Sequence, residues 1–202
     1  MYSSSDYRYR LRLRVFIGAV IDVPREALVY QAELTREARL EWGMDAPIAA
    51  LAGQLMQESG FDPKAKSAYA SGLSQFTPAT ARWISTLSTR LSDPNPLDPS
   101  WSIRAMVFYD HLLHDGVNPA NDECGRYRAM LAEYNGGAKR WADRQKLSKE
   151  PGNYDVTAVI NPGISKSNQQ QNQNYAFFVV YRWQAIFVSW SGPLVCLPKT
   201  GN

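Results

Sequence analysis

The residue best placed for chemistry is Glu58, which lies at the end of an apolar helical pattern. Ile48, Leu51 and Leu55 recur at helical spacing. Because Glu58 follows Leu55 by three residues, its carboxyl group extends this apolar stripe. Burial disfavours the charged form of a carboxyl group and raises its pKa, which suits a proton donor near neutral pH. Gly60 predicts that the helix ends directly after Glu58, so we expect a general acid where a helix meets a loop.

The residues after Glu58 decide against the ordinary interpretation of a glutamate near a helix end, which is a solvated surface charge. They form a polar, turn-rich segment with a specific order of residues: Glu58-Ser59, Phe61-Asp62-Pro63, Ser67, Gly72-Leu73-Ser74-Gln75 and Thr77-Pro78-Ala79-Thr80. This order resembles the soluble lytic transglycosylases of the lysozyme-like superfamily.

Two later blocks extend the resemblance. Residues 133–137, Glu-Tyr-Asn-Gly-Gly, are similar to the family's Tyr-Asn-Ala-Gly motif. Asn174 and Tyr175 resemble the last family block, Glu-Thr-x-x-Tyr-Val, although Gln171 stands where that block has its Glu. The blocks follow the family's order and cover roughly residues 47–178.

The resemblance implies a reaction that needs one carboxyl group and no cofactor or metal. Glu58 would protonate the oxygen of the β-1,4 bond between N-acetylmuramic acid and N-acetylglucosamine in peptidoglycan. As a carboxylate, it would then take the proton of the muramic acid C6 hydroxyl, which attacks C1 and gives a 1,6-anhydro product. Ordinary glycosidases use two carboxylates instead.

The resemblance also assigns substrate-binding roles. Ser67 matches a serine near the acid and the N-acetyl group, and Gln75 matches a glutamine that lines the cleft. Tyr134 and Asn135 match the pair beside the reacting sugar, and Tyr175 matches a tyrosine that approaches the acid. The alternatives are turn residues for Ser67 and Asn135, a surface side chain for Gln75 and core aromatic rings for the tyrosines.

Three other functions compete with this interpretation. A goose-type lysozyme-like hydrolase would use water and a second carboxylate, for which Asp62, Asp93 and Asp98 are candidates. A non-catalytic wall-binding module of a phage or secretion assembly would predict a decayed acid, whereas Glu58 is intact. Nucleic-acid binding would need a basic body, and outside one arginine-rich arm the charges cancel. We therefore expect peptidoglycan glycan strands as the partner and no nucleic acid.

The remaining reactive side chains indicate no metal site. His111 and His114 have helical spacing but no third ligand block, which favours a solvated helix end. Cys124 and Cys196 are too few for a disulfide scaffold, and the sequence leaves open whether they pair or stay free.

The chain of 202 residues reads as one mainly α, lysozyme-like domain with little or no β structure. An arm of residues 1–24 precedes this domain, which spans residues 25–202. Helices are expected over residues 25–42, 46–59, 78–91, 100–116, 122–135, 138–146 and 175–190, with Asp45 capping the second. Residues 150–167 read as irregular, and the Gln/Asn tract over residues 168–174 is too short to be a domain.

The arm carries the excess positive charge. Arg8, Arg10, Arg12 and Arg14 alternate with apolar residues, which is a strand pattern with one cationic face. We expect it to contact a virion partner or an anionic membrane surface. The arm reads poorly as a signal peptide. Because the implied substrate lies outside the cytoplasmic membrane, we expect action on the cell wall after delivery by a bacteriophage.

Overall fold

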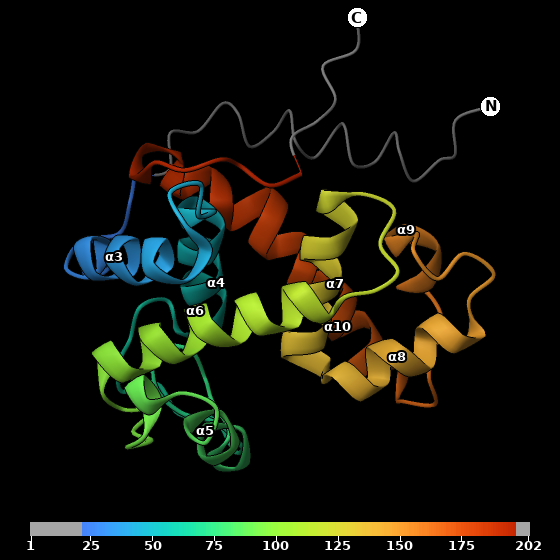
Figure 1. Cartoon of the computed structure of the whole chain (residues 1–202), viewed down its shortest axis with the longest axis horizontal. Coiled ribbons are helices and arrows are strands. Elements are labelled where there is room, and N and C mark those ends of the chain that lie inside the picture. The colour runs from blue at the N-terminus through green and yellow to red at the C-terminus, as the bar shows by residue number, and fades with distance from the viewer. Residues whose placement is uncertain (1–21, 197–202) are drawn as a thin grey trace, which may run out of the picture.

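The computed structural model describes residues 22–196, which form a helical domain (Figure 1). The α-helices are α2 (Arg25–Leu28), α3 (Gln31–Trp42), α4 (Ile48–Ser59), α5 (Pro78–Ser85), α6 (Pro99–Gly116), α7 (Glu123–Gly136), α8 (Ala138–Leu147), α9 (Tyr154–Thr157) and α10 (Lys166–Phe177). A short 3₁₀ turn, η1 (Thr89–Leu91), follows α5. After α10 the helix continues as a π-helical stretch, η2 (Phe178–Trp183), and then as a 3₁₀ stretch, η3 (Gln184–Trp190).

The expected mainly α fold is confirmed. Within residues 22–196 the backbone forms isolated bridges between Lys66 and Ser71 and between Ser71 and Phe76, and no β-strand. The predicted division into an arm and a domain stays a prediction, since residues 1–21 lie outside the described part of the chain.

Helix α4 is the central element. Its residues from Ile48 to Leu55 are all buried, and it packs against η2 and η3 on the C-terminal segment and against α3. Gly53 makes this packing close, because a Cβ atom there would lie 2.8 Å from the backbone nitrogen of Gln184. Helix α6 crosses the molecule between α3 and α7, and α7 packs against α8 and α10 (Figure 1). The C-terminal end of α4 is therefore held from several sides.

Local capping chemistry explains several helix boundaries. The side chains of Thr77, Asp98 and Asp122 accept backbone N–H bonds at the starts of α5, α6 and α7. Gly60 adopts a left-handed conformation with φ of 60° and ends α4. The predicted cap by Asp45 was wrong, because α4 begins after Pro47 without a side-chain cap bond.

Several predicted segments needed correction. The helix expected over residues 25–42 is divided into α2 and α3, and residues 150–167, which were expected to be irregular, contain α9. The helix expected over residues 78–91 is divided into α5 and η1, and the helix expected from Ser100 or Ser102 begins at Pro99. The helix expected over residues 175–190 begins earlier, as α10, within a tract of Gln and Asn residues, of which Asn is a weak helix former and Gln a good one. Polar side chains of this tract find tertiary partners: Gln169 and Gln173 both donate to the carbonyl oxygen of Ala158.

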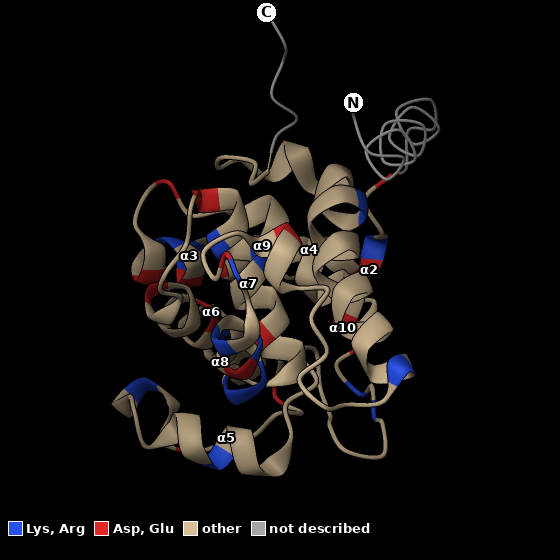
Figure 2. Cartoon of the chain, turned by 90° about the vertical axis from the view of Figure 1, so that its right-hand side faces the viewer, with Lys and Arg blue, Asp and Glu red and all other residues tan. Residues whose placement is uncertain are grey.

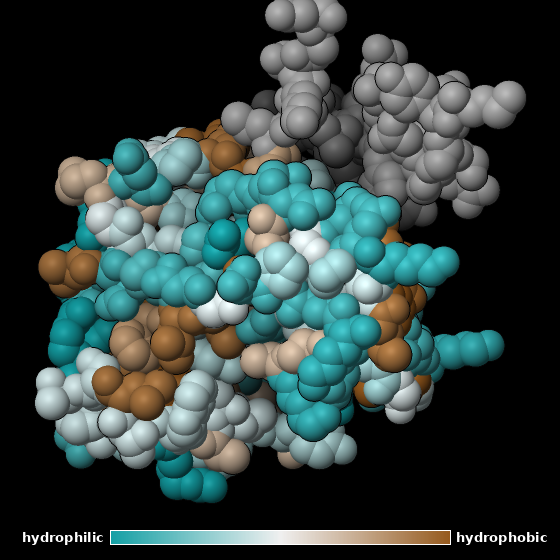
Figure 3. Space-filling view, turned by 45° about the vertical axis from the view of Figure 1, so that its right-hand side comes forward, coloured by the Kyte–Doolittle hydropathy of each residue, from teal (hydrophilic) through white to brown (hydrophobic). Residues whose placement is uncertain are grey.

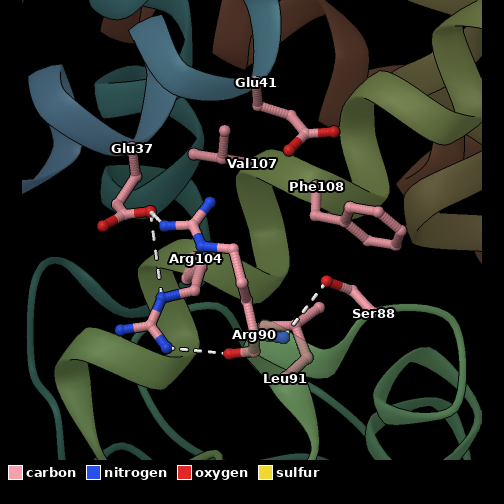
Figure 4. Close-up of a pocket in the computed structure, with 8 residues that line it drawn as sticks. All are labelled: Glu37, Glu41, Ser88, Arg90, Leu91, Arg104, Val107 and Phe108. Atoms are coloured by element: carbon pink, nitrogen blue, oxygen red, sulfur yellow. Dashed lines mark hydrogen bonds and ion pairs between the residues drawn. The ribbon is translucent and has the colours of Figure 1, made fainter.

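Charged residues of both signs are distributed over the helices, as Figure 2 shows for one face. Glu37 on α3 is only 3% exposed and pairs with Arg36, Arg90 and Arg104. Arg90 belongs to η1 and Arg104 to α6, so the cluster joins three elements (Figure 4). The free space beside it is about 10 Å³, which is room for about one water molecule. We interpret this cluster as structural.

A disulfide between Cys124 and Cys196 joins the start of α7 to the segment after η3. The two cysteines are 72 residues apart, and the bond therefore closes a long loop of the unfolded chain. It fixes the C-terminal segment against α7 while η2 and η3 pack against α4.

We predict that replacing both cysteines by serine lowers thermal stability. Losing a cross-link that closes a loop of this length removes about 4 kcal/mol in the chain-entropy picture, which corresponds to a fall in Tm on the order of 10 °C. Thermal unfolding followed by circular dichroism measures the change. A reductant should lower the Tm of the wild type and leave that of the double variant unchanged; equal Tm values under all conditions would contradict the prediction.

Candidate active site

The carboxyl group of Glu58 lies at the last turn of α4, where the helix gives way to the loop of residues 61–76. The side chain is partly buried, and burial raises its pKa from 4.5 to about 8. The hydroxyl of Tyr175 donates a hydrogen bond of 2.5 Å to Oε1 and acts in the opposite direction, lowering the pKa. Glu58 therefore carries a proton at neutral pH and has a donor ready to stabilise its anion.

Tyr175 and Tyr134 form an aromatic wall beside Glu58. Their rings stack with centroids 6.5 Å apart and planes 6° apart. The Tyr134 hydroxyl donates to the carbonyl oxygen of Ser74 at 2.7 Å. Burial raises the pKa of both hydroxyls well above 10, so both remain protonated donors.

The ring contacts continue outward from this wall. The ring centroids of Tyr109 and Tyr134 are 5.5 Å apart, and the Trp83 ring packs edge-on against Tyr109 with centroids 5.8 Å apart. Trp83 is 48% exposed. Figure 3 shows hydrophobic patches between hydrophilic residues on one face of the molecule. Rings and polar groups close together suit a ligand that has both apolar and hydroxylated faces, as a sugar does.

The loop of residues 61–76 is fixed by its own polar side chains. The Gln75 amide donates to the carbonyl oxygens of Ala65 and Gly72 at 3.1 and 2.9 Å. Gly72 has φ of 81°, and a Cβ atom there would overlap the carbonyl oxygen of Pro96 at 1.6 Å. The Ser67 hydroxyl is exposed and accepts from the backbone nitrogen of Ala70 at 3.0 Å. The structure thus directs the side chains of Ser67 and Gln75 to loop backbone.

The predicted site residues fall into two groups. Glu58 contacts Tyr175, and Tyr175 stacks on Tyr134. Asn135 follows Tyr134 at the end of α7, where its Oδ1 accepts from Asn172 at 3.1 Å. Ser67 and Gln75 instead support the loop. The catalytic role of Glu58 and contact of the other five residues with substrate stay predictions.

Sequence reasoning missed a second buried carboxyl group, Asp110 on α6. It is fully buried and accepts from the Gln54 amide at 3.1 Å. Burial raises its pKa well above the usual range; Gln54 lowers it and the charge of Glu58 raises it further. Burial therefore favours the protonated form of Asp110. The sequence did contain a sign that a buried polar partner was needed, because Gln54 is a polar residue one helical turn before Glu58 on the same apolar face.

Glu133 lies within the Glu-Tyr-Asn-Gly-Gly motif block, and burial raises its pKa to about 7. Its neighbour in the structure is Tyr109, whose pKa is raised to about 12 by burial and then by the charges of Glu133 and Asp110. Glu133 is therefore a second carboxyl group that titrates near neutrality, on the helix that carries Tyr134 and Asn135.

The carboxylates considered for a water-using mechanism have other tasks. Asp62 accepts from the backbone nitrogen of Lys64 at 2.8 Å, and Asp98 caps α6 by accepting from Trp101 at 2.9 Å. Asp93 is exposed.

His111 contacts Glu41, and His114 contacts Glu123. Within residues 22–196, His, Cys, Asp and Glu side chains form no group of three or more that could hold a metal ion.

One partly buried acid with a tyrosine donor can break a glycosidic bond by giving up a proton and taking one back, which places the protein among glycan-cleaving enzymes of the lysozyme-like type. Residues 34–156 match the family described as the transglycosylase SLT domain. Because the match covers more than half of the chain, the protein belongs to this family and is a peptidoglycan lytic transglycosylase. Tyr175 lies beyond the matched residues. A search of curated proteins found none that matches the chain.

We predict a fall in kcat/KM as the pH rises through about 8, because the active form of Glu58 carries the proton. Tyr175→Phe removes a hydrogen bond to the carboxylate, so the pKa of Glu58 rises and the fall moves to higher pH. The shift should be on the order of one pH unit, which corresponds to about 1.4 kcal/mol. Rates of cleavage of soluble glycan fragments, taken from about pH 6 to about pH 10, measure this shift of the pH profile.

Tyr134→Phe is the matched control for this prediction. It also removes one buried tyrosine hydroxyl, but that hydroxyl donates to Ser74 and not to Glu58. Its pH profile should therefore keep the wild-type position. A downward shift for Tyr175→Phe, or equal shifts for both variants, would show that Tyr175 does not stabilise the Glu58 anion.

Proposed function

We propose that Glu58 serves this lytic transglycosylase first as the acid and then as the base, and that the enzyme degrades the cell wall for a bacteriophage. The observation that carries the first part is the raised pKa of Glu58 together with its hydrogen bond from Tyr175. The proton on Glu58 suits the first step. The Tyr175 hydroxyl suits the second, because it stabilises the carboxylate between the two proton transfers.

The proposed reaction balances without water. Glu58 gives its proton to the oxygen that leaves with N-acetylglucosamine, and the bond from that oxygen to C1 of N-acetylmuramic acid breaks. The C6 hydroxyl oxygen of the same muramic acid forms a new bond to C1. Its proton returns to Glu58, which ends the cycle in its starting state. The product end is a 1,6-anhydro sugar.

The positions of the other carboxyl groups support this route over attack by water. A water-using enzyme needs an ionised carboxylate that orients the water. Burial favours the neutral form of Asp110, and Asp62 and Asp98 accept backbone N–H bonds within their own segments. Glu58 and Glu133 are left as the carboxyl groups that titrate near neutral pH, and Glu58 has the Tyr175 hydroxyl to stabilise its anion after the proton leaves.

We predict that purified sacculi treated with the enzyme release muropeptides with 1,6-anhydromuramic acid ends, resolved by mass spectrometry. In ¹⁸O-labelled water these ends should carry no label, whereas hydrolysis would place ¹⁸O at reducing ends. Glu58→Gln keeps the shape and removes the proton, so release should fall by about a hundredfold or more. Labelled reducing ends from the wild type would establish the lysozyme reaction instead.

We propose in addition that the enzyme acts at the cell wall after delivery by a phage particle, with the arm contacting the particle or an anionic surface. Support comes from the sequence, in which four arginines alternate with apolar residues between positions 8 and 14. This part of the chain lies outside the described residues. Between residues 22 and 196 no helix is long and apolar enough to cross a membrane.

We predict that deleting Met1 to Arg14 spares the cleavage of soluble glycan fragments and slows the digestion of intact sacculi. The difference should be largest at low salt, where charge attraction is least screened. Replacing Arg8, Arg10, Arg12 and Arg14 by glutamine is the matched control that keeps the arm and removes its charge. Equal losses on both substrates would show instead that the arm is part of the fold.

A further inference from the structure

Asn172 on α10 lies in a buried polar network next to the active site. It is 4% exposed. Its Oδ1 accepts from Nη1 of Arg144 at 2.6 Å, and its Nδ2 donates to the carbonyl oxygen of Ala132 at 2.9 Å and to Oδ1 of Asn135 at 3.1 Å. Arg144, on α8, is itself only 2% exposed. The network therefore runs from α8 through α10 to the end of α7.

The chemistry of these partners fixes which way the Asn172 amide points. A guanidinium group can only donate, and a backbone carbonyl can only accept. Turning the amide over would place donor against donor at Arg144 and acceptor against acceptor at Ala132. Asn172 must therefore donate from Nδ2 to Asn135, and Asn135 must accept this hydrogen bond with its Oδ1. The Nδ2 group of Asn135, with two N–H donors, is left to point away from Asn172.

Gly136 gives an independent sign that this arrangement is built in. A Cβ atom at position 136 would lie 2.7 Å from Nδ2 of Asn172, closer than side-chain carbons approach their neighbours. A residue other than glycine would displace the Asn172 amide from its partners. The chain next to Asn135 is therefore shaped to admit Asn172.

We propose that Asn172 is a positioning residue for glycan cleavage, which holds Asn135 so that its N–H donors face the substrate. These donors would bind an acceptor oxygen of an N-acetylated sugar, the carbonyl oxygen of the N-acetyl group or a ring hydroxyl. The proposal rests on the proposed function of the Glu58 site. It explains why a polar side chain is retained at a buried position of α10.

The first test compares Asn172→Asp with Gln169→Glu. Both variants replace an amide by an acid that can still accept from Arg144, since Gln169 Oε1 also accepts from Arg144 at 2.9 Å. Only Asn172→Asp removes the donor to Asn135, which then turns its own N–H group toward the new carboxylate and its oxygen toward the substrate. We expect kcat to fall about tenfold or more, as for one lost hydrogen bond to substrate, and Gln169→Glu to stay near wild type.

A double-mutant cycle separates positioning from a general structural effect. Asn135→Asp keeps the bond from Asn172 but replaces the N–H donors by an oxygen, so it should lose activity to a similar extent. The double variant Asn135→Asp, Asn172→Asp should lose little more than the larger single loss, because both changes remove the same donors. Losses that multiply, or wild-type kcat for Asn172→Asp, would overturn the proposal.

Amide NMR on the wild type tests the proposal even if Asn172→Asp does not fold. The side-chain NH₂ protons of Asn172 should be protected from solvent exchange, and those of Asn135 should exchange and shift when a trimer of N-acetylglucosamine is added. The reverse pattern would overturn the proposal. Because wild-type product analysis on sacculi is independent of these variants, a failure here is distinguishable from a failure of the proposed reaction.

Discussion

The candidate site depends on the hydrogen bond between Tyr175 and Glu58, which joins segments 117 residues apart. A carboxyl group can act as a proton donor near neutral pH only if it is partly removed from water, yet its anion must still be stabilised when the proton leaves. Burial at the end of α4 supplies the first condition, and the Tyr175 hydroxyl supplies the second. Both conditions require the C-terminal segment to pack closely against α4, which Gly53 permits by lacking a side chain where Gln184 approaches.

The same constraint accounts for the shape of the surroundings. Tyr175 is held by stacking on Tyr134, whose hydroxyl donates to the carbonyl oxygen of Ser74. Ser74 in turn forms hydrogen bonds to Ser102 on α6 through both its backbone nitrogen and its hydroxyl. The loop after Glu58 is held by the Gln75 amide and by the tight approach of Gly72 to Pro96. Each contact limits how far the groups around Glu58 can move, and preorganisation of this kind is what a one-acid mechanism needs, because the same group must meet two oxygens in turn.

Several polar groups are buried behind the site, and burying them without hydrogen-bond partners costs free energy of folding. Asp110 and Gln54 share one hydrogen bond, while the second oxygen of Asp110 and the amide oxygen of Gln54 have no partner among the described residues. A neutral Asp110 costs less to bury than an anion would, which agrees with its raised pKa. The network of Arg144, Asn172 and Asn135 shows the opposite case, in which each buried amide atom of Asn172 has a partner of matching donor or acceptor type.

The sequence alone predicted Glu58 as the acid and determined the helical fold and most helix starts, because apolar spacing and capping side chains act within a few residues of one another. Glu58 was indicated by its place on the stripe of Ile48, Leu51 and Leu55 together with the order of residues that follows it, and the caps by Thr77 and Asp122 followed from their residue types. Only the tertiary structure decided that the Gln/Asn tract is helical, that Cys124 pairs with Cys196, and that Asn172 reaches Asn135. It also decided that Ser67 and Gln75 turn to loop backbone, whereas the approach of Tyr175 to Glu58 was expected from the family resemblance and is confirmed. These outcomes depend on packing between segments far apart in the chain, and the free energy of that packing belongs to no single stretch of sequence.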